Sequence, residues 1–147
     1  MLQACEFLAA LGATLFAGAA LYISVVEHPA RMELDTRAAV AQWAPSYRRA
    51  TWMQAPLALL SFVAGTTAWL MGAGAGWLIA AVSIGAAVPF TLIVIMPTNH
   101  ELLAPGRDLG AAETRQLLTR WGKLHAVRSA LGLLAAAVYL WLLLREG

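Results

Sequence analysis

Four long apolar segments alternate with polar segments along the chain. Charged side chains are nearly absent from residues 7–26, 51–71, 76–96 and 124–144. Each segment has about 20 residues, the length that a helix rising about 1.5 Å per residue needs to cross a hydrocarbon layer of about 30 Å. The fourth reaches this length only if the polar residues at its start face protein. The pattern therefore predicts four membrane-spanning helices.

Small and polar residues recur at every third or fourth position within these segments. Ala10, Thr14, Gly18 and Tyr22 do so in the first segment, and similar rows occur in the other three. Residues at this spacing share one helix face, and small residues allow helices to pack closely in lipid. We therefore expect an all-α fold, an integral membrane four-helix bundle of up-down-up-down topology. The same stripes would also permit a homo-oligomer.

Prolines mark the expected ends of the helices. Proline disfavours a helical conformation in the residue before it, so the first helix should end just before Pro29 and the third just before Pro97. Pro45 should interrupt a short segment, residues 32–44, ahead of the second span. The last helical pattern begins near residue 111 and has no such interruption before residue 144.

Composition supports a membrane protein of one domain. The 147 residues are 61% hydrophobic and 12% charged, whereas soluble domains carry about 25% charged residues. The chain lacks the polar side chains that would cover a water-facing surface. We therefore treat residues 1–147 as a single four-span domain in contact with the lipid bilayer.

The basic residues predict how the chain is oriented. Of the 10 lysines and arginines, all but Arg145 lie in or next to two longer loops, about residues 27–50 and 97–123. Loops rich in lysine and arginine tend to stay in the cytoplasm. Both termini should then lie on the non-cytoplasmic side of a bacterial-type inner (plasma) membrane that the chain crosses several times. Because topology accounts for the basic residues, a net charge of +2 indicates no nucleic-acid partner.

Polar residues at the cytoplasmic ends of the spans form the candidate site. Arg128 lies a turn inside the last apolar segment, on the same helix face as Trp121 and His125. An ionisable residue at that depth is a functional hypothesis by default, and Glu27 is its expected ionic partner. The alternative is that these residues are interfacial anchors or a structural ion pair. The other polar residues at this level are Tyr22, His28, Arg48, Gln54, Thr98 and Asn99.

Two chemistries fit this set of side chains. His28 or His125 would act as a general base toward an acidic carbon or a phenol, a role that suits imidazole near neutral pH. Arg128 and the Asn99 amide would then stabilise the oxyanion that forms. Alternatively, His28, His100 and His125 would bind a transition metal. The histidine and cysteine spacings of known metal motifs do not occur in the chain, so no cofactor is favoured.

Short motifs along the chain resemble those of one family. They are Glu27-His28-Pro29-Ala30-Arg31, Tyr47-Arg48-Arg49, Met96-Pro97-Thr98-Asn99 and Trp121-x-x-x-His125-x-x-Arg128. In this order they resemble the anthrone-oxygenase-like family of small four-helix integral membrane proteins. The resemblance implies that some members oxidise an anthrone methylene to a quinone with O₂ and without an established cofactor. The family pattern falls here on His28, Asn99, Trp121, His125 and Arg128.

These observations predict a membrane oxygenase that acts on a small, lipid-soluble phenolic or ketone substrate by base-assisted O₂ chemistry. Its partners would be O₂ and a small hydrophobic aromatic molecule. The competing interpretation is a non-catalytic membrane protein for small-molecule binding, transport or assembly. The expected catalytic residues are His125, Arg128, Asn99 and His28. The expected substrate-binding residues are Trp121, Tyr22, Glu27, Thr98, Gln54 and Arg48.

Overall fold

The computed structural model describes residues 1–146, with side chains described through Arg145. Within this range the chain forms helices and no strand. Four continuous helical stretches are long and apolar enough to cross a membrane, namely Leu2–Arg31, Thr36–Leu70, Ala75–Leu102 and Ala112–Arg145. The prediction of an all-α protein is confirmed within this range, with four helices of the length and composition that crossing a membrane requires.

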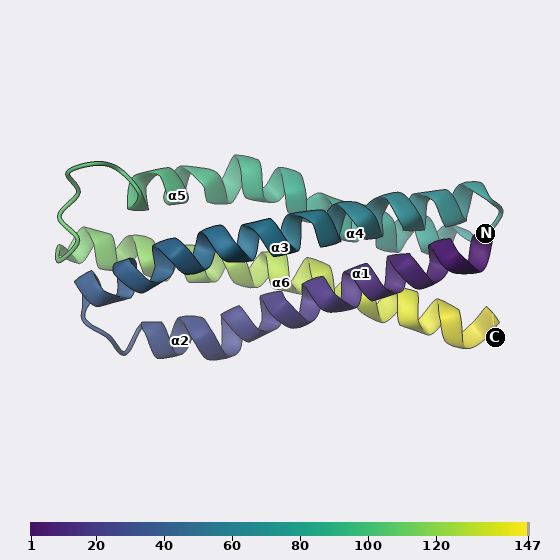
Figure 1. The fold of residues 1–147 in the computed structure, drawn as a ribbon, viewed down its shortest axis with the longest axis horizontal. Coiled ribbons are helices and arrows are strands. Elements are labelled where there is room, and N and C mark those ends of the chain that lie inside the picture. The colour runs from purple at the N-terminus through teal and green to yellow at the C-terminus, as the bar shows by residue number, and fades with distance from the viewer. Residues whose placement is uncertain (147) are drawn as a thin grey trace.

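The first and third stretches are each divided by a short π-helical turn. The first consists of α1 (Leu2–Tyr22), η1 (Ile23–Glu27) and α2 (His28–Arg31). The second is the single helix α3 (Thr36–Leu70). The third consists of α4 (Ala75–Phe90), η2 (Thr91–Ile95) and α5 (Met96–Leu102), and the last is α6 (Ala112–Glu146). Both termini lie at one end of the bundle, and the α2–α3 and α5–α6 connections lie at the other (Figure 1).

The first and third helical stretches continue past Pro29 and Pro97, so the prediction that they end there is wrong. The residue before each proline closes a wide turn: the His28 N–H donates to the Ile23 carbonyl, and the Met96 N–H donates to the Thr91 carbonyl. A wide turn accommodates the proline ring and its missing N–H, so the chain stays helical. The extra turns carry candidate site residues toward the α2–α3 end of the bundle.

Helix α3 also passes through Pro45, which was expected to interrupt it. The helix begins at Thr36, where the Asp35 side chain accepts a hydrogen bond of 3.0 Å from the Ala38 N–H, a standard N-cap. Pro45 is exposed, and α3 continues through it without a break. The uninterrupted helix places Trp43 and residues one and two turns later on one face.

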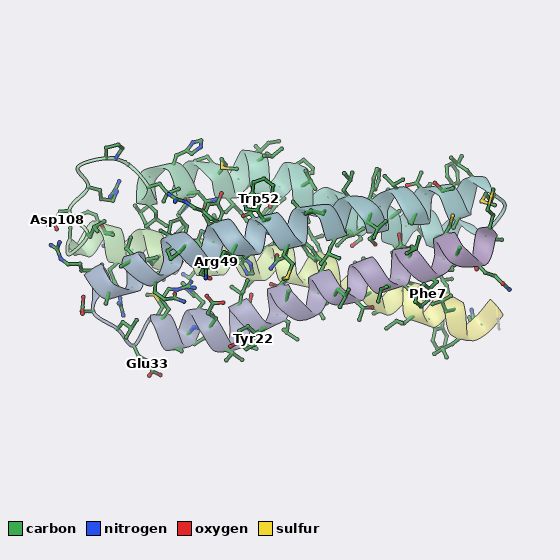
Figure 2. The ribbon with its side chains drawn as sticks, in the orientation of Figure 1. Phe7, Tyr22, Glu33, Arg49, Trp52 and Asp108 are labelled. Carbon is green, nitrogen blue, oxygen red and sulfur yellow. The ribbon has the colours of Figure 1, made fainter. Side chains whose placement is uncertain are left out.

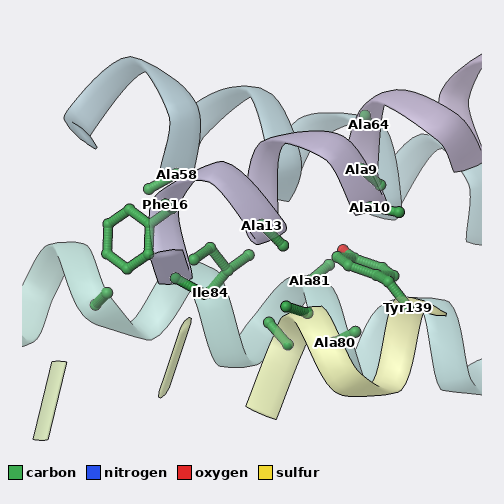
Figure 3. Close-up of a cluster of buried hydrophobic side chains, with 14 of the residues drawn as sticks. Ala9, Ala10, Ala13, Phe16, Ala58, Ala64, Ala80, Ala81, Ile84 and Tyr139 are labelled. Atoms are coloured by element: carbon green, nitrogen blue, oxygen red, sulfur yellow. The ribbon is translucent and has the colours of Figure 1, made fainter. Parts of the chain in front are cut away.

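An alanine-rich core fills the half of the bundle nearest the termini. Alanines from all four spans pack around a few large side chains, and Figure 3 shows Phe16, Ile84 and Tyr139 among them. Small residues allow close approach of helices in lipid, and the aromatic rings fill the remaining space. A second cluster, which includes Ile23, Trp43 and Trp121, occupies the half nearest the α2–α3 connection.

Replacing Gly65 by alanine is expected to destabilise the alanine-rich core by about 1–3 kcal/mol. A Cβ atom at Gly65 would lie 1.9 Å from the hydroxyl oxygen of Tyr139, a fully buried side chain. Gly18 is the matched control, because a Cβ atom there meets no atom within 4 Å. Thermal unfolding in detergent should show a lower midpoint for Gly65→Ala and no decrease for Gly18→Ala. Equal midpoints for the two variants would contradict this packing.

Candidate functional site

Two aromatic rings on one face of α6 form the centre of the candidate site. Trp121 and His125 are 4% and 3% exposed, and their rings stack with centroids 4.9 Å apart. The ring of His28, from α2, lies 5.3 Å from that of Trp121. This contact depends on Gly122, where a Cβ atom would come within 2.3 Å of His28 Nε2. The structure therefore brings together three of the predicted residues.

Two further aromatic residues extend this stack, and the sequence-based prediction of the site missed both. Trp43 is fully buried and meets Trp121 edge-on, with ring centroids 5.8 Å apart. Tyr47 stacks on Trp43 at 5.1 Å, nearly parallel. Their four-residue spacing was visible in the sequence, but an expected break at Pro45 separated them.

Two serines hold the ring of His125 on its other side. Ser24 Oγ lies 3.0 Å from His125 Nδ1 and 2.8 Å from Ser129 Oγ. Ser129 donates to the backbone carbonyl of Ala20 at 3.0 Å. Ser129 follows His125 by one helical turn, so its sequence position could have predicted that it lies next to His125. Ser24 comes from η1, and nothing in the sequence indicated its contact with His125. His125 is thus fixed between an aromatic face and a polar anchor.

A buried ion pair lies beside the aromatic stack. Arg31 is 3% exposed, and its Nη2 lies 2.5 Å from Glu27 Oε1. Arg31 also donates to Gln42, and its guanidinium carbon lies 5.8 Å from the Trp121 ring centroid. Glu27 accepts a further hydrogen bond from Ser46. The expectation that Glu27 pairs with Arg128 is therefore wrong, because the nearer Arg31 occupies the carboxylate.

Arg128 instead borders an apolar cavity of about 120 Å³ between α3, α4 and α6. Its guanidinium carbon lies 5.1 Å from the Phe16 ring centroid, and its buried Nε has no hydrogen-bond partner. Three ion pairs occur among the described side chains, and none includes Arg128. The other walls of the cavity include Tyr47, Thr51, Thr91, Leu92 and Met96. The cavity therefore combines an apolar interior with one cationic group.

Three predicted polar residues are buried without partners. Gln54, Thr98 and Asn99 are fully buried, and their side-chain polar atoms make no hydrogen bond in the structure. Buried polar groups are nearly always satisfied by protein, water or a ligand, so each of these has unused binding capacity. Gln54 borders a separate groove between α1 and α3 rather than the cavity at Arg128.

The remaining predicted residues lie on the outside of the bundle. Tyr22 is 57% exposed and projects from its outer edge (Figure 2). Arg48 and His100 are also exposed. Within residues 1–146, no group of three or more His, Cys, Asp or Glu side chains is arranged to hold a metal ion. The structure therefore does not gather His28, His100 and His125 into the alternative ligand set.

Comparison with known proteins identifies the family. A sequence profile of the anthrone oxygenase family matches residues 43–138, which include Trp43, Asn99, Trp121, His125 and Arg128. The chain belongs to this family. No solved structure matches the chain.

Curated relatives agree with the family assignment. Anthrone oxygenase tpcL of Aspergillus fumigatus is 33% identical over 148 residues, covering 94% of this chain and 92% of the relative. Anthrone oxygenase ptaC of Pestalotiopsis fici is 33% identical over 132 residues, covering 74% of this chain and 90% of the relative. At the level of the family, the chain is similar to oxygenases, as its motifs indicated.

Proposed function

We propose that the protein is a membrane oxygenase that uses O₂ to oxidise a small, lipid-soluble aromatic ketone or phenol. The observation that carries the proposal is Arg128, a cation without a carboxylate partner at the wall of an apolar cavity. Such a group is suited to a neutral substrate that becomes an anion during the reaction. Family membership supports the same class of reaction.

A methylene group activated by a neighbouring aromatic ketone would be the reacting part of the substrate. His125 would remove one proton, and the C–H electron pair would move toward the ketone oxygen to form an enolate. Arg128 would stabilise the negative charge on that oxygen, with Asn99 as a second donor. The enolate carbon would form a C–O bond with O₂, and the peroxide would take up a proton. Loss of water then leaves a second carbonyl, so CH₂ and O₂ become C=O and H₂O.

The position of the cavity fits a substrate that arrives from the lipid. Val88 and Leu92 line the cavity and are exposed on the outer surface of the bundle, which would face lipid. Tyr47 lines it as well, and joins it through Trp43 to the Trp121 stack. A planar aromatic molecule would contact these rings while its oxygen faces Arg128. An enolate of this kind is electron-rich enough to reduce O₂ directly, so the proposed reaction needs no further group.

Oxygen consumption by the purified protein tests this proposal. Protein in detergent or nanodiscs is mixed with anthrone, the substrate that appears in the names of the curated relatives. We expect consumption of one O₂ per anthrone, at a rate proportional to protein concentration and well above spontaneous oxidation. Anthrone binding without protein-dependent oxygen uptake would contradict the proposal and favour a non-catalytic binding protein.

We also propose that the end of the bundle that holds the site faces the cytoplasm, in a bacterial-type inner membrane. Nine of the ten basic residues lie in or next to the two long loops, whereas Arg145 lies near the C-terminal end of α6. The connections that contain these loops lie at the end of the bundle opposite the termini (Figure 1). Because the named relatives are fungal proteins, they do not indicate a bacterial membrane. The test therefore addresses only the orientation of the bundle. A periplasm-active reporter should be active when fused to the C terminus and inactive when inserted at Gly106. The reverse pattern would overturn this orientation.

A further inference from the structure

The hydrogen bonds around His125 run toward backbone carbonyls, and this direction restricts where the protons lie. Ser129 Oγ lies 3.0 Å from the carbonyl oxygen of Ala20 and 3.1 Å from that of His125. A carbonyl oxygen can only accept a hydrogen bond. A hydroxyl group this close to two acceptors is expected to point its single proton between them, so Ser129 donates to the carbonyls rather than to Ser24 or His125.

The next contact in the chain is fixed by the first. Ser24 Oγ lies 2.8 Å from Ser129 Oγ, a normal hydrogen-bond distance between two hydroxyl groups. Since Ser129 has already used its only proton, Ser24 must donate its own. Ser24 then has no proton left for His125, although its Oγ lies only 3.0 Å from Nδ1. Nδ1 must therefore carry a proton and donate it to Ser24.

We propose that Ser24 and Ser129 are positioning residues that hold neutral His125 with its proton on Nδ1, which leaves Nε2 unprotonated as the base. Among the described residues, every side-chain hydrogen bond of His125 is made through Nδ1. The role of Nε2 in removing a substrate proton rests on the proposed function. The position of the proton does not, because it is argued from the hydrogen-bond partners of Ser129, Ser24 and His125.

His28 has the opposite proton arrangement. Its Nδ1 lies 3.3 Å from Nη1 of Arg31. A guanidinium group can only donate, so Nδ1 of His28 accepts and a neutral ring carries its proton on Nε2. His28 therefore has no free basic nitrogen in this arrangement. This distinction assigns the base role to His125 and leaves His28 as a hydrogen-bond donor beside Trp121.

The wide turn η1 accounts for the position of Ser24. Ser24 lies inside η1, and the His28 N–H closes this turn at the Ile23 carbonyl. The same turn therefore brings the serine to His125 and the next residues, including His28, to Trp121. Wide turns of this kind are frequent at functional sites.

Nitrogen NMR of histidine-labelled protein tests the proton positions directly. The full-length protein carries ¹⁵N-histidine in detergent micelles, at a pH where its imidazoles are neutral. Three histidines are present, and His125→Gln, His28→Gln and His100→Gln assign their signals. We expect His125 to be protonated at Nδ1 and His28 at Nε2. A His125 ring protonated at Nε2 would overturn the proposal whether or not the protein is an oxygenase.

Serine variants test the positioning role. Ser24→Ala with Ser129→Ala should release His125 from the Nδ1–H form and lower kcat by about tenfold, the equivalent of one lost hydrogen bond. KM should change by less than about twofold. The single variant Ser24→Thr keeps the hydroxyl group, so it should retain both the Nδ1–H form of His125 and the kcat of the unmodified protein. Ser83→Ala is the matched control, because Ser83 also bonds α6, through the Leu131 carbonyl, away from His125.

The outcomes separate this inference from the proposed function. A double variant that keeps both the Nδ1–H signal and full activity would refute the positioning role. A second outcome is that the unmodified protein takes up no oxygen, while its Nδ1–H signal disappears in the double variant. This outcome would support the hydrogen-bond chain and refute the oxygenase. Loss of activity with unchanged nitrogen signals would also refute the positioning role, because the serines would then act on folding or on substrate.

Discussion

Replacing His125 by glutamine is expected to lower kcat for anthrone oxidation by about 10²–10⁴-fold, the usual contribution of a general base. Glutamine keeps a polar group beside Ser24 and a flat amide beside Trp121, but it cannot accept a proton at neutral pH. KM should change little, because the apolar cavity is untouched. Initial rates of oxygen uptake over a range of anthrone concentrations measure both quantities.

His100→Gln is the control for this experiment. His100 is an exposed histidine on α5, outside the cavity and the aromatic stack. Its replacement should leave kcat and KM as they are in the unmodified protein. Equal activity of His125→Gln and His100→Gln would show that His125 is not the base. Equal losses in both would show that the effect is not specific to the position of His125.

Replacing Arg128 by methionine is expected to lower kcat by about 10²–10³-fold, the usual cost of removing a group that stabilises an oxyanion. Methionine retains an apolar contact with Phe16 but has no charge. Lysine should be intermediate, because it keeps the charge and loses the planar guanidinium. Thermal stability should be unchanged or higher in Arg128→Met, since a partly buried cation without a carboxylate partner does not favour folding.

This combination of lower activity and undiminished stability separates a functional arginine from a structural one. Arg120→Met provides the control, because Arg120 is exposed on the same helix and lies outside the cavity. It should change neither the rate nor the unfolding midpoint. If Arg128→Met unfolds at a lower temperature while the remaining folded protein keeps its activity, Arg128 supports the bundle and does not stabilise an anion.

The helical fold was predictable because its signal is local. Four runs of spanning length with almost no charged residues are visible in the sequence, and water-free surroundings force such runs to be helical. The prolines were misread because their effect depends on the turn before them. Pro29 and Pro97 follow wide turns, and Pro45 faces outward. Sequence spacing alone does not show how a neighbouring turn accommodates a proline.

The site was predictable where its residues share one helix. Trp121 and His125 are four residues apart, so their common face follows from helical geometry. Contacts between helices were harder to predict, because they depend on the angle and depth of packing. Glu27 pairs with Arg31 on its own helical stretch rather than with Arg128. Ser24, a residue without a motif, reaches His125 from a position 101 residues away.

The source of the new carbonyl oxygen tests the central claim most directly. Purified protein is incubated with anthrone under ¹⁸O₂ in ordinary water, and the product is analysed by mass spectrometry, with His125→Gln in parallel. The account predicts a product that carries one ¹⁸O atom and forms far faster with the unmodified protein than with the variant. A product without ¹⁸O, or one formed equally fast by the variant, would contradict it.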